Sequence, residues 1–233
     1  LSRMVHFTLF GIPVYIRPSF WVVLAIFGGA LSISSVEDLI YPALFVIAGF
    51  IAILSHEMGH ALVGRRLGGG QQTIVLELFG GLTSSHGMQL TRGGRALMIL
   101  AGPMMTLLLG IISLWLTWNI VAPVMASHNL DFWDLAISPF TAALISPKLY
   151  ILSCLIMIGE WWTLLNLLPI YPLDGGQLIA QYIRSPRKVF MTGFITAILI
   201  GLLSFQLFHG YFIPIFMALF AYSNYREYKN APF

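Results

Sequence analysis

The sequence predicts an all-α polytopic membrane protein with six transmembrane helices and one small membrane-associated β-hairpin. The 233 residues are 58% hydrophobic and 9% charged, and the mean hydropathy is +0.85, which leaves too little polar surface for a soluble particle. A bilayer core about 30 Å thick requires about 20 apolar residues per helix. Runs of that kind lie near residues 18–36, 42–65, 95–119, 149–169, 189–208 and 210–226.

The basic residues orient these spans. Of the 12 lysines and arginines, only Lys148 falls on the side of the membrane opposite to the termini. Because positively charged loops stay in the cytoplasm, we expect both termini to be cytoplasmic. The same distribution explains the net charge of +3 without a nucleic-acid partner. The partners expected instead are the lipid bilayer and a membrane-embedded substrate.

The β-hairpin is predicted between the second and third helices. A β-rich apolar stretch at 73–79 is followed by Gly80 and Gly81 and then by a second short stretch at 82–85, which is typical of two strands joined by a glycine turn. Such a hairpin can enter the membrane only where its backbone is buried in protein or lines a wet cavity. No linker or internal repeat interrupts the chain, so we expect one domain over 1–233.

The second span ends in the sequence Ser-His-Glu-Met-Gly-His, which contains His56, Glu57 and His60. Histidines four residues apart lie on one face of a helix. Both imidazoles can then reach one zinc ion at about 2.0–2.1 Å, and Glu57 is placed to take a proton from the water that the zinc activates. Because such residues are costly inside an apolar span, their presence there indicates function.

A catalytic zinc usually has three protein ligands, and the end of the fourth span offers the third. In Asn-Leu-Leu-Pro-Ile-Tyr-Pro-Leu-Asp-Gly-Gly, from Asn166 to Gly176, two prolines break the helix and Asp174 is expected on unwound backbone. The second and fourth spans run in the same direction, so Asp174 should lie at the depth of the two histidines. A Leu-Asp-Gly turn alone is more often a loop. Together with the histidine pair, it predicts one zinc ion per chain held by His56, His60 and Asp174.

These motifs resemble the site-2 protease family of intramembrane zinc metalloproteases, over a core of about 42–180. The resemblance implies that Gly80 and Gly81 belong to a hairpin beside the active site, and that an edge strand of this hairpin pairs with the unwound backbone of the substrate. It also implies that Asn166 contacts the substrate. A helix-end hydrogen bond explains Asn166 equally well.

A further segment of the resemblance is Ala101-Gly102-Pro103, which is similar to the Gly-Pro that begins the family's third core helix. The family often has asparagine three residues after this proline, whereas this chain has Thr106. The resemblance further implies a minimal six-helix member, without a PDZ or CBS domain, in the inner membrane of a bacterium.

The expected function is that of a zinc-dependent intramembrane endopeptidase. It would cleave a single-span membrane protein within or near its transmembrane segment and release a regulator such as a transcription factor. One alternative is a zinc transporter or sensor that uses the same ligands without hydrolysis, although transporters often contain internal repeats. Another is a different metalloprotease fold whose third ligand is Glu160. Neither the natural substrate nor the oligomeric state follows from the sequence.

Overall fold

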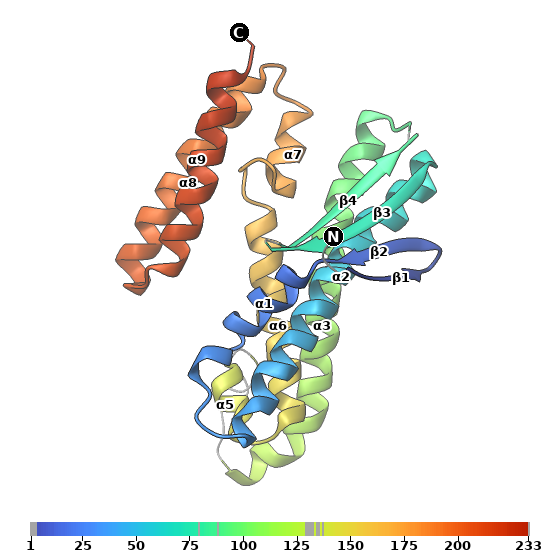
Figure 1. Cartoon of the computed structure of the whole chain (residues 1–233). Coiled ribbons are helices and arrows are strands. Elements are labelled where there is room, and N and C mark those ends of the chain that lie inside the picture. The colour runs from blue at the N-terminus through green and yellow to red at the C-terminus, as the bar shows by residue number, and fades with distance from the viewer. Residues whose placement is uncertain are drawn as a thin grey trace. The chain divides into compact units, whose positions relative to one another are not determined.

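A computed structural model describes residues 4–78, 80–87, 89–128, 133, 136 and 138–232. Figure 1 shows its helices and strands. The chain forms two compact units, Leu1–Thr163 and Leu164–Phe233. The single domain predicted for 1–233 and the core predicted for 42–180 stay predictions.

The first unit contains one four-stranded sheet. Its strands, in spatial order, are β1 (Val5–Leu9), β2 (Ile12–Ile16), β3 (Gln71–Glu77) and β4 (Gly80–His86). The pairs β1–β2 and β3–β4 are antiparallel, and β2 pairs with β3 in parallel. In β2 and β3 alternate residues are buried, which is the period of a strand with one covered face.

The expected two-stranded hairpin is therefore half of a larger sheet. It is present as β3 and β4, and Phe79, which the prediction included, lies outside the described residues. The expectation missed β1 and β2, which precede the first helix. They are joined at Phe10 and Gly11, both with positive φ angles, and Arg65 donates a 2.7 Å hydrogen bond to the Phe10 carbonyl.

The described part of the first unit also contains helices. They are α1 (Pro18–Phe27), α2 (Ile40–Gly68), α3 (Arg92–His128), α5 (Pro139–Ala143) and α6 (Pro147–Asn166), with 3-10 turns at Ala30–Ser32 and Glu37–Leu39. The helix α6 extends three residues past Thr163. Buried apolar side chains of β2, β3, α1 and α2 form one core cluster. Figure 1 shows α2 and α3 side by side.

Four helical segments of the described chain are long and apolar enough to cross a membrane: Glu37–Gly68, Arg92–Ile120, Pro147–Asn166 and Pro186–Leu207. They support a membrane protein and correspond to four of the six expected spans. The first expected span is shorter than predicted, because α1 ends at Phe27 and Gly29 has a φ of 89° that no helix accommodates. The sixth corresponds to α9 (Phe212–Asn230), whose last turns carry Arg226, Glu227 and Lys229.

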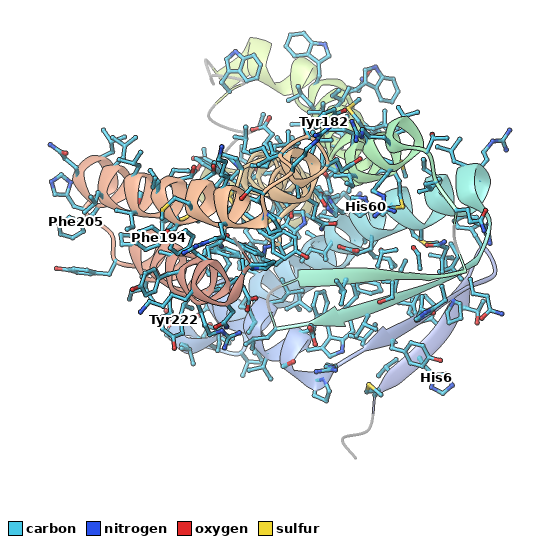
Figure 2. All side chains as sticks on the ribbon, turned by 90° about the horizontal axis from the view of Figure 1, so that it is seen from above. His6, His60, Tyr182, Phe194, Phe205 and Tyr222 are labelled. Atoms are coloured by element: carbon cyan, nitrogen blue, oxygen red, sulfur yellow. The ribbon has the colours of Figure 1, made fainter. Side chains whose placement is uncertain are left out.

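The second unit consists of α7 (Asp174–Ala180), α8 (Pro186–Phe208) and α9. The helices α8 and α9 form an antiparallel pair, because the guanidinium of Arg187, near the start of α8, lies 4.7 Å from the ring centre of Tyr228, near the end of α9. Figure 2 labels Phe194 and Phe205 on α8 and Tyr222 on α9 along this pair. Buried Ile170, from the loop before α7, packs against Ala197 and Met217 in the core of the unit.

Candidate active site

The two motif histidines lie buried in α2 and face one another. His56 is 2% exposed and His60 is 7% exposed, and their Nε2 atoms are 3.1 Å apart. The His60 Nδ1 lies 2.8 Å from the carbonyl oxygen of Met98, on α3; Figure 2 labels His60 on its helix. A carbonyl can only accept a hydrogen bond, so the Nδ1 of His60 carries a hydrogen and donates it.

This hydrogen bond determines which ring nitrogen of His60 is available to bind a metal. A neutral imidazole with hydrogen on Nδ1 presents a lone pair at Nε2, and in His60 that lone pair points toward His56. Two nitrogens that each lie about 2.0–2.1 Å from a tetrahedral zinc are about 3.3 Å apart, close to the 3.1 Å separation found here. An imidazole that donates its other N–H to a backbone carbonyl is also the usual arrangement for a zinc-bound histidine. The pair therefore fits zinc.

Two glycines let α3 pass directly over this pair. A Cβ atom at Gly102 would collide with the Nε2 of His60 and would lie 2.9 Å from the Nε2 of His56. A Cβ at Gly59, on α2, would collide with the carbonyl oxygen of Ala101. Close packing of the two helices therefore requires glycine on both sides. In this chain, the position of the histidine pair therefore requires glycine at position 102 of the segment Ala101-Gly102-Pro103.

Glu57 is held by β4. Its side chain is 4% exposed, and the hydroxyl of Thr83 donates a 2.7 Å hydrogen bond to its Oε2. The same hydroxyl lies 3.2 Å from the backbone carbonyl of Glu57. A Cβ atom at Gly81 would collide with the Glu57 side chain. Since Gly81 and Thr83 are two residues apart, they share one face of the strand, and that face covers Glu57.

The contact of Thr83 with Glu57 was not predicted from the sequence. Glu57 lies 26 residues earlier in the chain, so no local pattern links the two residues. The alternation of faces along a strand could have indicated Thr83. Once Gly81 is expected beside the active site, the residue two positions later is expected on the same face of the strand.

Gly80 lies at the start of β4 and is held by α6. Its φ is 124°, and a Cβ atom there would lie 2.6 Å from the indole ring of Trp162. In the sheet, Gly80 pairs with Glu77 and Gly81 with Leu76. The strand β4 is an outer strand of the four. The substrate contact predicted for Gly80 and Gly81 stays a prediction.

Thr106, where the sequence departs from the family pattern, joins two helices. Its side chain is fully buried, and its Oγ1 lies 2.8 Å from the Oγ1 of Thr163 on α6 and 3.0 Å from the carbonyl oxygen of Pro103. The two hydroxyls thus form a polar contact between α3 and α6. Buried polar groups between membrane helices require such partners.

In the second unit, the expected position of Asp174 needs one correction. Asp174 is the first residue of α7 rather than part of unwound backbone, and it follows an irregular loop of residues 167–173. Acidic residues are favoured in the first turn of a helix because they face its positive end. The carboxylate is 5% exposed.

The two glycines after Asp174 pack α7 against this loop. A Cβ atom at Gly175 would collide with the carbonyl of Leu167, and one at Gly176 would collide with the carbonyl of Ile170. Asn166, predicted to contact the substrate, is the last residue of α6 and is buried. Its role stays a prediction.

His56 and His60 in the first unit and Asp174 in the second unit are each buried, and all three are residue types that bind zinc. Two histidines and a carboxylate are a zinc-peptidase set. Glu160, the alternative third ligand, is exposed on α6. A helical membrane protein with a His-Glu-x-x-His motif buried inside an apolar helix therefore has the architecture of an intramembrane zinc metallopeptidase.

Comparison with known proteins supports this class. The family model described as peptidase family M50 matches residues 44–208, and the chain belongs to that family. The resemblance to site-2 proteases is thereby confirmed. A solved structure titled Site-2 Protease from Methanocaldococcus jannaschii has a similar fold, with a TM-score of 0.61 at 23% identity, and the match covers 97% of this chain and 95% of that one.

Curated relatives have names of the same kind. A zinc metalloprotease of Methanocaldococcus jannaschii is 27% identical over 227 residues, which are 93% of this chain and 57% of the relative. A protein of Synechocystis sp., provisionally named a zinc metalloprotease, is 29% identical over 188 residues, 76% of this chain and 43% of the relative. The chain thus spans about half the length of these relatives. Their names agree with the expected zinc and do not favour a transporter.

Proposed function

We propose that this chain is a zinc-dependent intramembrane endopeptidase that cleaves a membrane-tethered protein within or near its transmembrane segment. The observation that carries the proposal is the geometry in α2, where two Nε2 atoms 3.1 Å apart lie beside a buried carboxylate inside an apolar helix. Burying polar groups of this kind inside a membrane costs free energy, so their presence there indicates a function.

The proposed roles follow from these contacts. His56, His60 and Asp174 hold the metal, and the Met98 carbonyl keeps the Nε2 of His60 available for it. When bound, zinc supplies Lewis acidity that polarises a carbonyl group and lowers the pKa of water to about 7. Glu57 accepts a proton from the attacking water and returns it to the leaving amine. Thr83 keeps the Glu57 carboxylate oriented for both transfers.

The outer strand β4 is the proposed binding strand for the substrate. A single-span helix keeps its carbonyl groups hydrogen-bonded and hidden, so it must unwind before cleavage. An extended peptide can replace those bonds by adding to the edge of a sheet. Gly80 and Gly81, without side chains, let β4 lie directly against Trp162 and Glu57, so a substrate paired with β4 would lie near the proposed base. Asn166 supplies a further polar contact to the substrate.

We also propose six spans with both termini in the cytoplasm of a bacterial cell, with the segment 18–36 that begins with α1, and α9, adding to the four long apolar helices. The basic residues support this orientation, because Arg65 and Arg66 lie in the last turn of α2 and Arg92 begins α3. Cleavage near this face would release a regulator, such as a transcription factor, into the cytoplasm.

The test is proteolysis by purified protein in lipid vesicles, with a single-span substrate that carries helix-weakening residues. Glu57→Gln keeps the shape of the side chain but removes the base, and we expect cleavage to fall roughly 100- to 10,000-fold. Glu160→Gln is the matched control, because it removes an exposed carboxylate from α6, and it should retain activity. Full proteolysis by Glu57→Gln would overturn the mechanism. Zinc flux across vesicles that survived Glu57→Gln would instead support a transporter.

A further inference from the structure

Asn224 is a buried polar side chain of the second unit that the proposed chemistry does not use. It lies on α9 and is 1% exposed. Its Nδ2 donates a 2.6 Å hydrogen bond to the carbonyl oxygen of Tyr171 and a 2.9 Å hydrogen bond to that of Phe220. Both partners can only accept, so the NH₂ group must face them and the orientation of the amide is fixed.

Tyr171 belongs to the loop that precedes Asp174. Three successive carbonyl groups of this loop are hydrogen-bonded. The first, of Ile170, accepts from the backbone N–H of Leu173 at 2.8 Å, and the third, of Pro172, accepts from the Gln177 side chain at 2.9 Å. These two bonds are local. The middle bond, at Tyr171, comes from Asn224, which is 53 residues away in the sequence.

The amide of Asn224 is confined by α8. A Cβ atom at Gly193 would collide with the Oδ1 of Asn224. A Cβ at Gly176, in the first turn of α7, would collide with the backbone of Ile170 and would lie 2.5 Å from the nitrogen of Tyr171. The peptide at Tyr171 is therefore held between Asn224 and the first turn of α7. Asp174 begins that turn, so a shift of Tyr171 moves the Asp174 carboxylate.

We propose that Asn224 is a positioning residue for Asp174: by holding the Tyr171 carbonyl, it fixes the carboxylate in the orientation that binds zinc. This inference rests on the proposed role of Asp174 as a ligand. It assigns a function to α9 that no motif in that helix indicates. Partners that orient a metal ligand typically contribute about 10- to 100-fold to metal affinity when they touch the ligand, and Asn224 acts through the loop backbone.

The test is zinc affinity, measured by competition with a chelator on the purified full chain. Asn224→Asp has the same shape but turns a carboxyl oxygen toward two carbonyl oxygens, so the bond to Tyr171 is lost. We expect about 10-fold weaker zinc binding. Gly193→Ala disturbs the same amide from α8 and leaves Asn224 in place, and it should weaken binding in the same direction. The matched control is Ser204→Ala, which removes a buried hydroxyl that bonds only the Gly201 carbonyl within α8 among the hydrogen bonds described.

The outcomes separate this inference from the proposed function. If Asp174→Ala lost zinc while Asn224→Asp and Gly193→Ala bound it like the unchanged chain, Asn224 would be a structural residue only and the inference would be overturned. If Asp174→Ala kept its zinc, the proposed ligand set itself would be wrong. A merely structural role would lower the unfolding temperature of the metal-free protein without changing zinc affinity. If Asn224→Asp does not fold, the zinc affinity of Gly193→Ala tests the inference: unchanged affinity overturns it, and weaker binding supports it.

Discussion

The hydroxyl of Thr83 donates a 2.7 Å hydrogen bond to the carboxylate of Glu57, and this bond links the sheet to the motif helix. Thr83 belongs to β4 and Glu57 to α2, so the orientation of the proposed base depends on how the outer strand lies. A substrate that pairs with β4 would therefore bind to the same element that holds the base.

We predict that Thr83→Val lowers the rate of peptide cleavage without changing zinc content. Valine has nearly the shape of threonine but cannot donate to the carboxylate, and a hydrogen bond to a charged group contributes about 1.5–3 kcal/mol. Cleavage should fall roughly 10- to 100-fold. The measurement is kcat and KM on a single-span substrate in lipid vesicles.

The control for this prediction is Thr83→Ser, which keeps the hydroxyl and should retain most of the activity. Equal loss of activity in Thr83→Ser and Thr83→Val would assign the effect to the missing methyl group and not to the hydrogen bond.

The local parts of the site could be predicted from the sequence, and the long-range parts could not. His56, Glu57 and His60 follow from helical spacing within one segment. The hairpin of β3 and β4 was also predicted, although Gly80 and Gly81 are the first residues of β4 and not the turn itself. Thr83 and Asn224 act on partners far away in the chain, for which one sequence offers no signal. The same holds for the parallel pairing of β2 with β3, which joins Val14 to Ile74.

Two errors in the predicted elements had visible causes. The first span was drawn through Gly28 and Gly29, although paired glycines weaken a helix, and α1 ends there. The strands β1 and β2 were missed because each has only five residues and their turn lacks the usual Asn-Gly or Asp-Gly pair. The alternation of Ile12, Val14 and Ile16 was a strand signal nonetheless.

We predict that Gly102→Ala abolishes or sharply weakens zinc binding. The added Cβ would occupy the space of the His60 Nε2 and would lie 2.9 Å from the His56 Nε2, so α3 would have to move away from the histidine pair. Zinc per chain, measured by elemental analysis, should fall well below that of the unchanged protein.

The same helix offers a matched control. Gly110→Ala adds an identical methyl group where no atom lies within 4 Å apart from its chain neighbours and the adjacent backbone of its own helix, so it should keep its zinc and its fold. A Gly102→Ala protein that bound zinc as tightly as Gly110→Ala would mean that the two imidazoles do not form the metal site in this arrangement.

The Thr106–Thr163 contact should contribute to the packing of α3 against α6. Thr106→Val removes one partner of the 2.8 Å bond, and we expect a loss of about 0.6–2 kcal/mol in the free energy of unfolding, the range for polar contacts between membrane helices. Unfolding in mixed micelles would measure it. The double variant with Thr163→Val should lose less than the sum of the two single variants, because neither hydroxyl is left buried with a missing partner. Strictly additive losses would show that the two hydroxyls are not coupled.

The third zinc ligand can be identified by measuring the amount of zinc per chain in the unchanged protein and in variants of the candidate ligands. We expect about one zinc per chain in the unchanged protein, since a catalytic site of this kind holds a single ion. Asp174→Ala should lose most of it, as should His56→Ala, because two remaining ligands bind zinc far more weakly than three. Glu160→Gln should keep its metal, since that carboxylate is exposed on α6, whereas the three proposed ligands are buried. The opposite pattern, with zinc lost from Glu160→Gln and kept by Asp174→Ala, would move the third ligand to α6 and leave the loop before α7 without a role in metal binding.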